Sequence, residues 1–204
     1  DKFEIIDGQH RLDACEILGV PVSYIVSNKA TIKDVVLINN TQKPWGNLDY
    51  LKTFCHKSHS NHEEYIKVKN FLDEHGLLFG ISLDLLTAGA YGNGGRDSAG
   101  AKTFKEGTFK IKNLEQANRW ATQLNKIKAF APQLVKSRKF CIGFRKVQKL
   151  EHFLLSLAYE QIEKNIRKFD RCQNQEDWNE AMVKAYNHNL KKTNKRISIK
   201  KEGF

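Results

Sequence analysis

The stretch Ile5-Ile6-Asp7-Gly8-Gln9-His10-Arg11-Leu12-Asp13-Ala14 passes from a β-branched run through a glycine turn into the start of a helix. Such a turn points the first backbone N–H groups of the helix at one spot, where the helix dipole also favours an anion. Gln9, His10 and Arg11 add an amide, an imidazole and a guanidinium, all of which bind phosphate oxygens. The stretch therefore predicts a phosphate site. The alternative is a plain strand-to-helix turn with a solvated Arg11.

Two motifs in this order resemble those of the ParB/sulfiredoxin superfamily. The first is Asp7-Gly8-Gln9-His10-Arg11 followed by Ala14, and the second is Asn39-Asn40-Thr41-Gln42-Lys43, which is similar to Glu-Asn-x-Gln-Arg. The resemblance implies that both motifs bind a nucleoside triphosphate, CTP or ATP, with Mg²⁺ arriving on its phosphates. The nucleotide-binding residues would be Gly8, Gln9, His10, Arg11, Asn40, Thr41, Gln42 and Lys43.

Three departures from the family pattern favour binding over catalysis. Gln9 stands where sulfiredoxin has its cysteine, which excludes the thiol reaction at this site. Asn39 stands where ParB proteins have Glu, and Lys43 replaces an arginine fork. One alternative is a ParB-like nuclease or another phosphoryl-transfer enzyme, with His10 and Arg11 as catalytic residues. Another is a non-catalytic interaction module whose pocket is vestigial.

The composition favours a phosphate-bearing partner. The 204 residues carry a net charge of +11, and 40% of them are hydrophobic, so the chain can bury a core and attract nucleic acid. No apolar run is long enough to cross a bilayer and no signal pattern opens the chain, so we expect a cytoplasmic protein with no membrane partner. DNA is the expected macromolecular partner, and a homodimer is the assembly we consider.

The pattern of elements predicts an α+β fold. Strands are expected at 2–6 and 20–27 around a helix at 9–18, and the first strand needs a neighbour to be stable. These elements form a partial ParB/sulfiredoxin-like α/β head, with its upstream elements absent. The expected domains are the head at 1–60, a mainly α-helical domain at 61–190 with a Gly-rich loop at 89–100, and a basic tail at 191–204.

The second domain is expected to be a bundle of amphipathic helices. Its apolar spacings predict helices at 61–76, 82–88, 114–127 and 175–190, and one long helix after Phe140 that buries residues as far as Leu157. Residues 103–111 are predicted to form a short hairpin or an isolated strand. The helices at 61–76 and 82–88 could form a helix-turn-helix, but the second has few cations, so packing within the bundle is favoured.

Clustered cations mark two candidate nucleic-acid contacts. One is a patch near the start of the long helix and the other is the basic tail; a solvated basic face is the alternative for the patch. The nucleic-acid-binding candidates are Arg138, Lys139, Arg145, Lys146, Lys149, Lys191, Lys192, Lys195 and Arg196. No resident metal is expected, because the Cys and His residues at 55–62 lack a second ligand pair. The four separated cysteines indicate reduced thiols rather than a disulfide framework.

Overall fold

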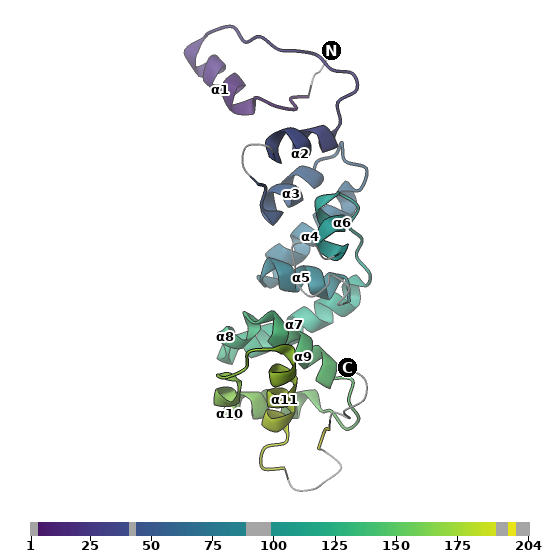
Figure 1. Cartoon of the computed structure of the whole chain (residues 1–204), viewed down its shortest axis with the longest axis vertical. Helices are drawn as coiled ribbons and strands as arrows, with labels where there is room; N and C mark the ends of the chain where they lie inside the picture. Colours follow the sequence, from purple (N-terminus) through teal and green to yellow (C-terminus); the bar gives the residue numbers. More distant parts are fainter. Residues whose placement is uncertain (1–3, 41–43, 89–98, 191–195, 199–204) are drawn as a thin grey trace. The chain divides into compact units, whose positions relative to one another are not determined.

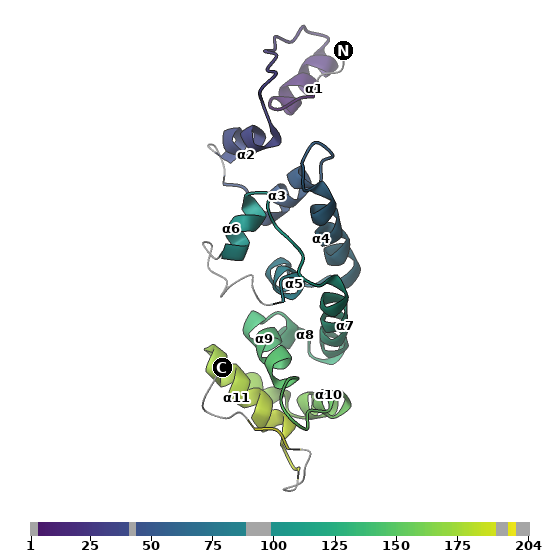
Figure 2. The same cartoon turned by 90° about the vertical axis from the view of Figure 1, so that its right-hand side faces the viewer.

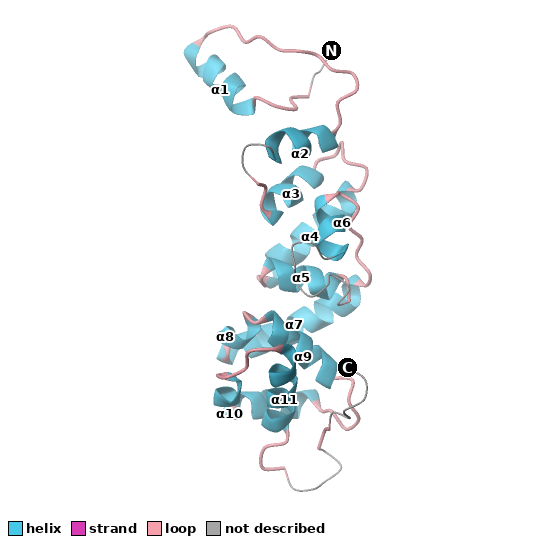
Figure 3. Ribbon diagram, in the orientation of Figure 1, coloured by secondary structure: helices cyan, strands magenta, loops and turns pink. Residues whose placement is uncertain are grey.

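Helices account for every regular element that the structure shows. This computed structural model describes residues 4–40, 44–88, 99–190 and 196–198, and within these ranges it contains no strand (Figure 3). The α-helices, labelled in Figure 1, are α1 (Gln9–Leu18), α2 (Ile32–Asn40), α3 (Asn47–Phe54), α4 (His62–His75), α5 (Phe79–Leu86), α6 (Ala99–Lys105), α7 (Leu114–Phe130), α8 (Pro132–Val135), α9 (Arg138–Val147), α10 (Leu155–Lys164) and α11 (Gln175–Tyr186). A 3₁₀ helix, η1 (Ile166–Phe169), lies between α10 and α11 in the sequence.

The prediction of an α+β fold with an α/β head is therefore wrong. The β-branched segment 20–27 is present but irregular, and its residues 21–27 form no backbone hydrogen bond with any described residue. Its side chains face solvent, and Ile25 is 97% exposed. A strand needs a partner that accepts and donates its ladder bonds, and β-branched composition alone does not supply one.

Two further predicted elements differ from the structure. Residues 103–111 were expected to be extended, but 103–105 belong to α6 and the rest form a turn and an irregular segment. The long helix after Phe140 is divided into α9 and α10. Within the division, His152 has a positive φ of 65°. A tertiary contact holds the division in place, because the Tyr186 hydroxyl accepts the backbone N–H of Leu154 at 2.9 Å.

The chain divides into two compact units, one of residues 1–70 with 92–110 and the other of residues 71–91 with 111–204. The first unit has an aromatic core. The Tyr65 ring lies 5.0 Å from Phe54 and 5.1 Å from Phe104, and its hydroxyl donates to the Phe104 carbonyl oxygen at 2.6 Å. Asn61 fixes the irregular segment after α6 by donating to the carbonyl oxygen of Phe109 at 2.7 Å. These contacts tie α3, α4 and α6 together.

In the second unit, α9 packs along α11 (Figures 1 and 2). The Phe140 ring makes edge contacts with Phe169 at 5.5 Å and Trp178 at 5.9 Å. Gly143 permits the close approach of the helices, because a Cβ there would lie 3.1 Å from Asn179 Oδ1. The core of this unit therefore holds η1 and α11 in a defined place, which positions the side chains described below.

The first two helices carry exposed apolar side chains. α1 contains no buried residue, and Ile17 and Leu18 are exposed. Leu37 of α2 is also exposed. Nowhere in the described ranges does a helix combine the length and the apolar character that crossing a membrane requires.

Candidate nucleic-acid interface

The turn that was predicted to bind phosphate begins α1. Gly8 has a φ of +86° and forms the N-cap, a left-handed conformation that favours glycine, and no side chain caps the helix. The Arg11 guanidinium contacts the Asp7 carboxylate at 3.3 Å, and Gln9 Nε2 donates to Asp13 Oδ1 at 3.1 Å. The His10 side chain is exposed. The turn therefore has uncapped N–H groups, and its arginine lies beside a carboxylate.

The second nucleotide motif is described only in part. Asn40 is the last residue of α2, and Thr41, Gln42 and Lys43 lie outside the described residues. The structure consequently does not test whether the two motifs meet. The nucleotide-binding residues, and the catalytic roles of His10 and Arg11, stay predictions.

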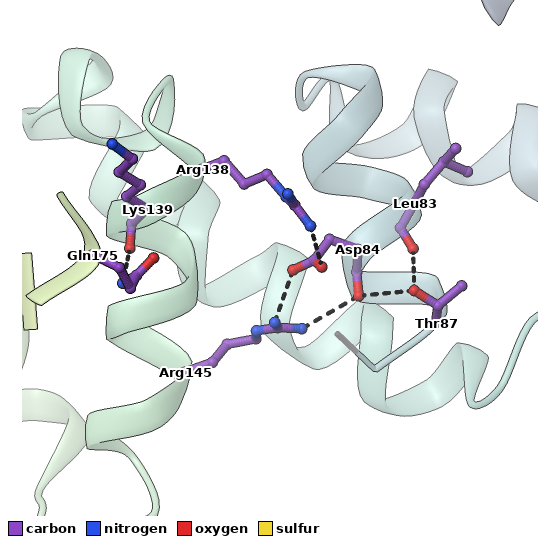
Figure 4. A network of polar contacts seen from close by, with 7 residues as sticks. All are labelled: Leu83, Asp84, Thr87, Arg138, Lys139, Arg145 and Gln175. Atoms are coloured by element: carbon purple, nitrogen blue, oxygen red, sulfur yellow. Dashed lines mark hydrogen bonds and ion pairs between the residues drawn. The ribbon is translucent and has the colours of Figure 1, made fainter. Parts of the chain in front are cut away.

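Two of the predicted phosphate ligands face a buried carboxylate instead of solvent. Asp84 of α5 is 3% exposed. Its Oδ1 accepts from Arg138 Nη2 at 2.9 Å, and its Oδ2 accepts from Arg145 Nη2 at 2.8 Å (Figure 4). A buried carboxylate is costly unless it is paired and hydrogen-bonded, and here the two arginines of α9 provide this compensation.

Further contacts hold Arg145 in this inward position. Its Nη1 donates to the Asp84 carbonyl oxygen at 3.3 Å, and its guanidinium lies 5.0 Å from the Trp120 ring centroid. The Arg145 side chain is only 11% exposed. The Asp84 network therefore joins α5 to α9 and is a structural element. The sequence contains a signal for it, since Asp84 is the one acidic residue in the apolar run Phe79-Gly80-Ile81-Ser82-Leu83-Asp84-Leu85-Leu86.

The remaining residues of the predicted patch differ in their surroundings. Lys139 Nζ donates to the Gln173 carbonyl oxygen, while the Lys139 carbonyl oxygen accepts from Gln175 Nε2 at 2.9 Å (Figure 4). Lys146 is half-buried, and Lys149 is exposed. In the basic tail, Lys191, Lys192 and Lys195 lie outside the described residues, whereas Arg196 lies within them.

A different set of cations gathers around a surface hollow of about 730 Å³ in the second unit. We call it the α11 hollow. Its walls come from η1, the turn after η1, α11 and the segment at 196–198. Its basic lining residues are Lys168, Arg171, Lys184, His188 and Arg196.

The two carboxylates that line the α11 hollow, Asp177 and Glu180, form hydrogen bonds with other groups of the protein. Asp177 Oδ2 accepts from the backbone N–H groups of Gln173 at 2.9 Å and Asn174 at 3.2 Å, and these bonds lower the pKa of the Asp177 carboxyl. Glu180 pairs with Lys184 at 2.9 Å, and this hydrogen bond raises the pKa of Lys184. Both carboxylates keep their negative charge, but among the described residues neither forms an ion pair with Lys168, Arg171 or Arg196.

Lys168 and Arg171 are exposed and form no ion pair with any residue that the structure describes. Arg196 donates from Nη1 to the Leu190 carbonyl oxygen at 3.1 Å, which leaves its other N–H groups for a ligand. The hollow is lined by four cationic side chains, Lys168, Arg171, Lys184 and Arg196, and by two carboxylates, and an excess of positive charge at one surface attracts anions. The sequence analysis predicted Arg196 but missed Lys168 and Arg171, although Ile166-Arg167-Lys168-Phe169-Asp170-Arg171 holds three cations in six residues.

The donor types define what the α11 hollow can bind. Ammonium and guanidinium groups bind phosphate oxygens, and neither ligates a metal ion at neutral pH. Among the residues with described positions, no three His, Cys, Asp or Glu side chains are grouped as a metal site. In comparisons with family models, curated proteins and solved structures, none matches the chain.

Proposed function

We propose that this protein is a DNA-associated protein that binds the phosphate backbone of duplex DNA in the α11 hollow. The observation that carries the proposal is that Lys168 and Arg171 are exposed, form no ion pair with any described residue, and line one surface hollow together with Arg196. The net charge of +11 supports the same partner, because long-range attraction brings polyanions to the surface.

The chemistry of these side chains indicates contact with phosphates rather than with base edges. Lys and Arg side chains bind phosphate oxygens and release the counterions condensed on DNA, so affinity falls as salt rises. Backbone contacts position a protein on the duplex without reading its sequence. We therefore expect binding that depends strongly on salt and weakly on base sequence.

The test is the salt dependence of binding to a fluorescently labelled duplex. The variant Lys168→Ala/Arg171→Ala should reduce the slope of log affinity against log salt by about 1.8, because each phosphate contact contributes roughly 0.9. The variant Lys112→Ala/Lys136→Ala is a charge-matched control from the same unit, at two exposed positions that do not line the hollow. Equal slopes for the two variants would contradict the proposal.

A second candidate function is nucleoside triphosphate binding at the Gly8 turn. It is favoured by the left-handed Gly8 at an uncapped helix start, together with the cation Arg11 in the first turn. Calorimetry with Mg²⁺·CTP and Mg²⁺·ATP tests it: Arg11→Ala should weaken binding, and Lys29→Ala, at an exposed lysine of the same unit, should not. Absence of heat with either nucleotide and the unaltered protein would rule this candidate out.

A further inference from the structure

A single side chain fastens the segment 196–198 to the end of α11. Asn187, the C-cap of that helix, donates from Nδ2 to the Ile197 carbonyl oxygen at 2.6 Å. Its Oδ1 accepts from the Ile197 backbone N–H at 3.0 Å. One amide thus satisfies both backbone polar groups of one residue, as a neighbouring strand does in a sheet.

Burial strengthens this attachment, which we call the Asn187 clamp. The Ile197 side chain is 2% exposed, so an apolar anchor acts together with the two hydrogen bonds. The clamp fixes the backbone of the residue directly after Arg196. Because Arg196 lines the α11 hollow, the clamp fixes the backbone from which its guanidinium extends, and the guanidinium itself donates to the Leu190 carbonyl oxygen.

We infer that Asn187 is a positioning residue of the phosphate site, acting through Arg196. A guanidinium on a freely moving segment would lose backbone and side-chain freedom when it binds a phosphate. Its contact would then form in only a fraction of the complexes, and its contribution to the salt slope would fall in proportion. With Ile197 held by Asn187, much of that freedom is already lost before the ligand arrives. The inference rests on the proposed function, since it assigns a role within the same hollow.

This role differs measurably from simple stabilisation of α11. If Asn187 acts through Arg196, the two residues serve one phosphate contact, and their substitutions are not additive. If Asn187 only supports the helix end, Asn187→Ala lowers thermal stability and leaves the salt dependence of DNA binding unchanged.

The experiment compares the unaltered protein with Asn187→Ala, Arg196→Ala and the double variant, using a labelled duplex over a range of salt concentrations. Arg196→Ala should reduce the slope by about 0.9, the value for one phosphate contact. Asn187→Ala should reproduce most of this loss, and the double variant should lose no more than Arg196→Ala alone. The variant Ile197→Pro leaves the sequence of α11 unchanged and removes both the N–H that Asn187 accepts and the buried apolar side chain, so it should give the same defect.

Arg119→Ala is the charge-matched control, since Arg119 is exposed and does not line the hollow. Additive losses, or an unchanged slope in Asn187→Ala when the unaltered protein binds DNA, would overturn the inference and leave the proposed function standing. No salt-dependent binding by the unaltered protein would overturn both. Far-UV circular dichroism verifies that each variant retains its helices.

Discussion

Two groups of cations in the same unit have opposite surroundings. Arg138 and Arg145 face inward to Asp84, at 2.9 and 2.8 Å, while Lys168 and Arg171 face solvent at the α11 hollow. All four belong to a chain with a large positive excess, and the sequence alone does not separate them. The first pair shares the buried Asp84 carboxylate. Near the second pair, Asp177 accepts a backbone N–H and Glu180 pairs with Lys184.

This comparison shows why a count of nearby cations does not locate a phosphate-binding surface. A guanidinium paired with a buried carboxylate would have to leave the Asp84 carboxylate uncompensated in order to bind DNA. An unpaired, exposed cation gives up only water and counterions. The position of acidic side chains, more than the density of basic ones, therefore determines which cations are available.

The largest effect is expected from removing the shared carboxylate. Asp84→Ala leaves Arg138 and Arg145 partly buried without their counter-charge, so the free energy of unfolding should fall by about 3 kcal/mol. Urea denaturation measures this change. Glu163→Ala, at an exposed position of α10, is the control and should leave the midpoint unchanged. A loss in Asp84→Ala as small as that in the control would mean that the network does not stabilise the unit.

A smaller effect on stability is expected when one arginine of a single group is replaced with alanine. Arg145→Ala removes an ion pair with Asp84 and the contact with Trp120, so it should cost about 2 kcal/mol of stability. Arg171→Ala should leave the urea midpoint in place but weaken DNA binding. If Arg145→Ala lowers the salt slope of DNA binding while its free energy of unfolding stays unchanged, the two groups do not differ in the way described.

The smallest effect concerns histidines, which show the same contrast. His59 is 4% exposed, its Nδ1 accepts from the Asn61 backbone N–H at 3.3 Å, and burial, with Lys33 and His62 nearby, lowers its pKa. His188 is exposed at the hollow. Because the unfolded chain binds the His59 proton more readily than the folded chain does, His59 contributes stability above pH 6.5, and this is lost as the pH falls toward the folded-state pKa.

Thermal unfolding between pH 7.5 and 5 checks the histidine prediction. The decline in stability on acidification should be reduced in His59→Gln and retained in His188→Gln. An equal decline in all three proteins would show that His59 is not its source.

Much of the helical structure could be predicted from periodicity and capping residues. Asn113 directly precedes the predicted helix at 114–127 and is a residue type that favours the N-cap, and its side chain accepts the Gln116 backbone N–H at 2.9 Å. The predicted strands were wrong, because β-branched residues favour an extended backbone but do not supply the partner strand that a sheet needs. The break between α9 and α10 depends on Tyr186, a residue 32 positions after Leu154 in the sequence, and no local pattern contains it.

The candidate site was less predictable than the helices. Arg196 was found from the charge of the tail, but its contact with the hollow depends on Asn187 and Ile197, which are paired across ten residues. Arg138 and Arg145 were predicted to bind phosphate because no local pattern links them to Asp84. Asp84 lies 54 positions before Arg138 and 61 positions before Arg145 in the sequence. Ion pairs between distant parts of a chain are a property of the packed structure.

Lysine acetylation of the protein with and without duplex DNA, followed by mass spectrometry, shows whether DNA occupies the α11 hollow. We expect DNA to protect Lys168 and Lys184, while the exposed Lys136 and Lys149, which do not line the hollow, keep their reactivity. Protection of Lys149 with Lys168 still reactive would contradict this expectation.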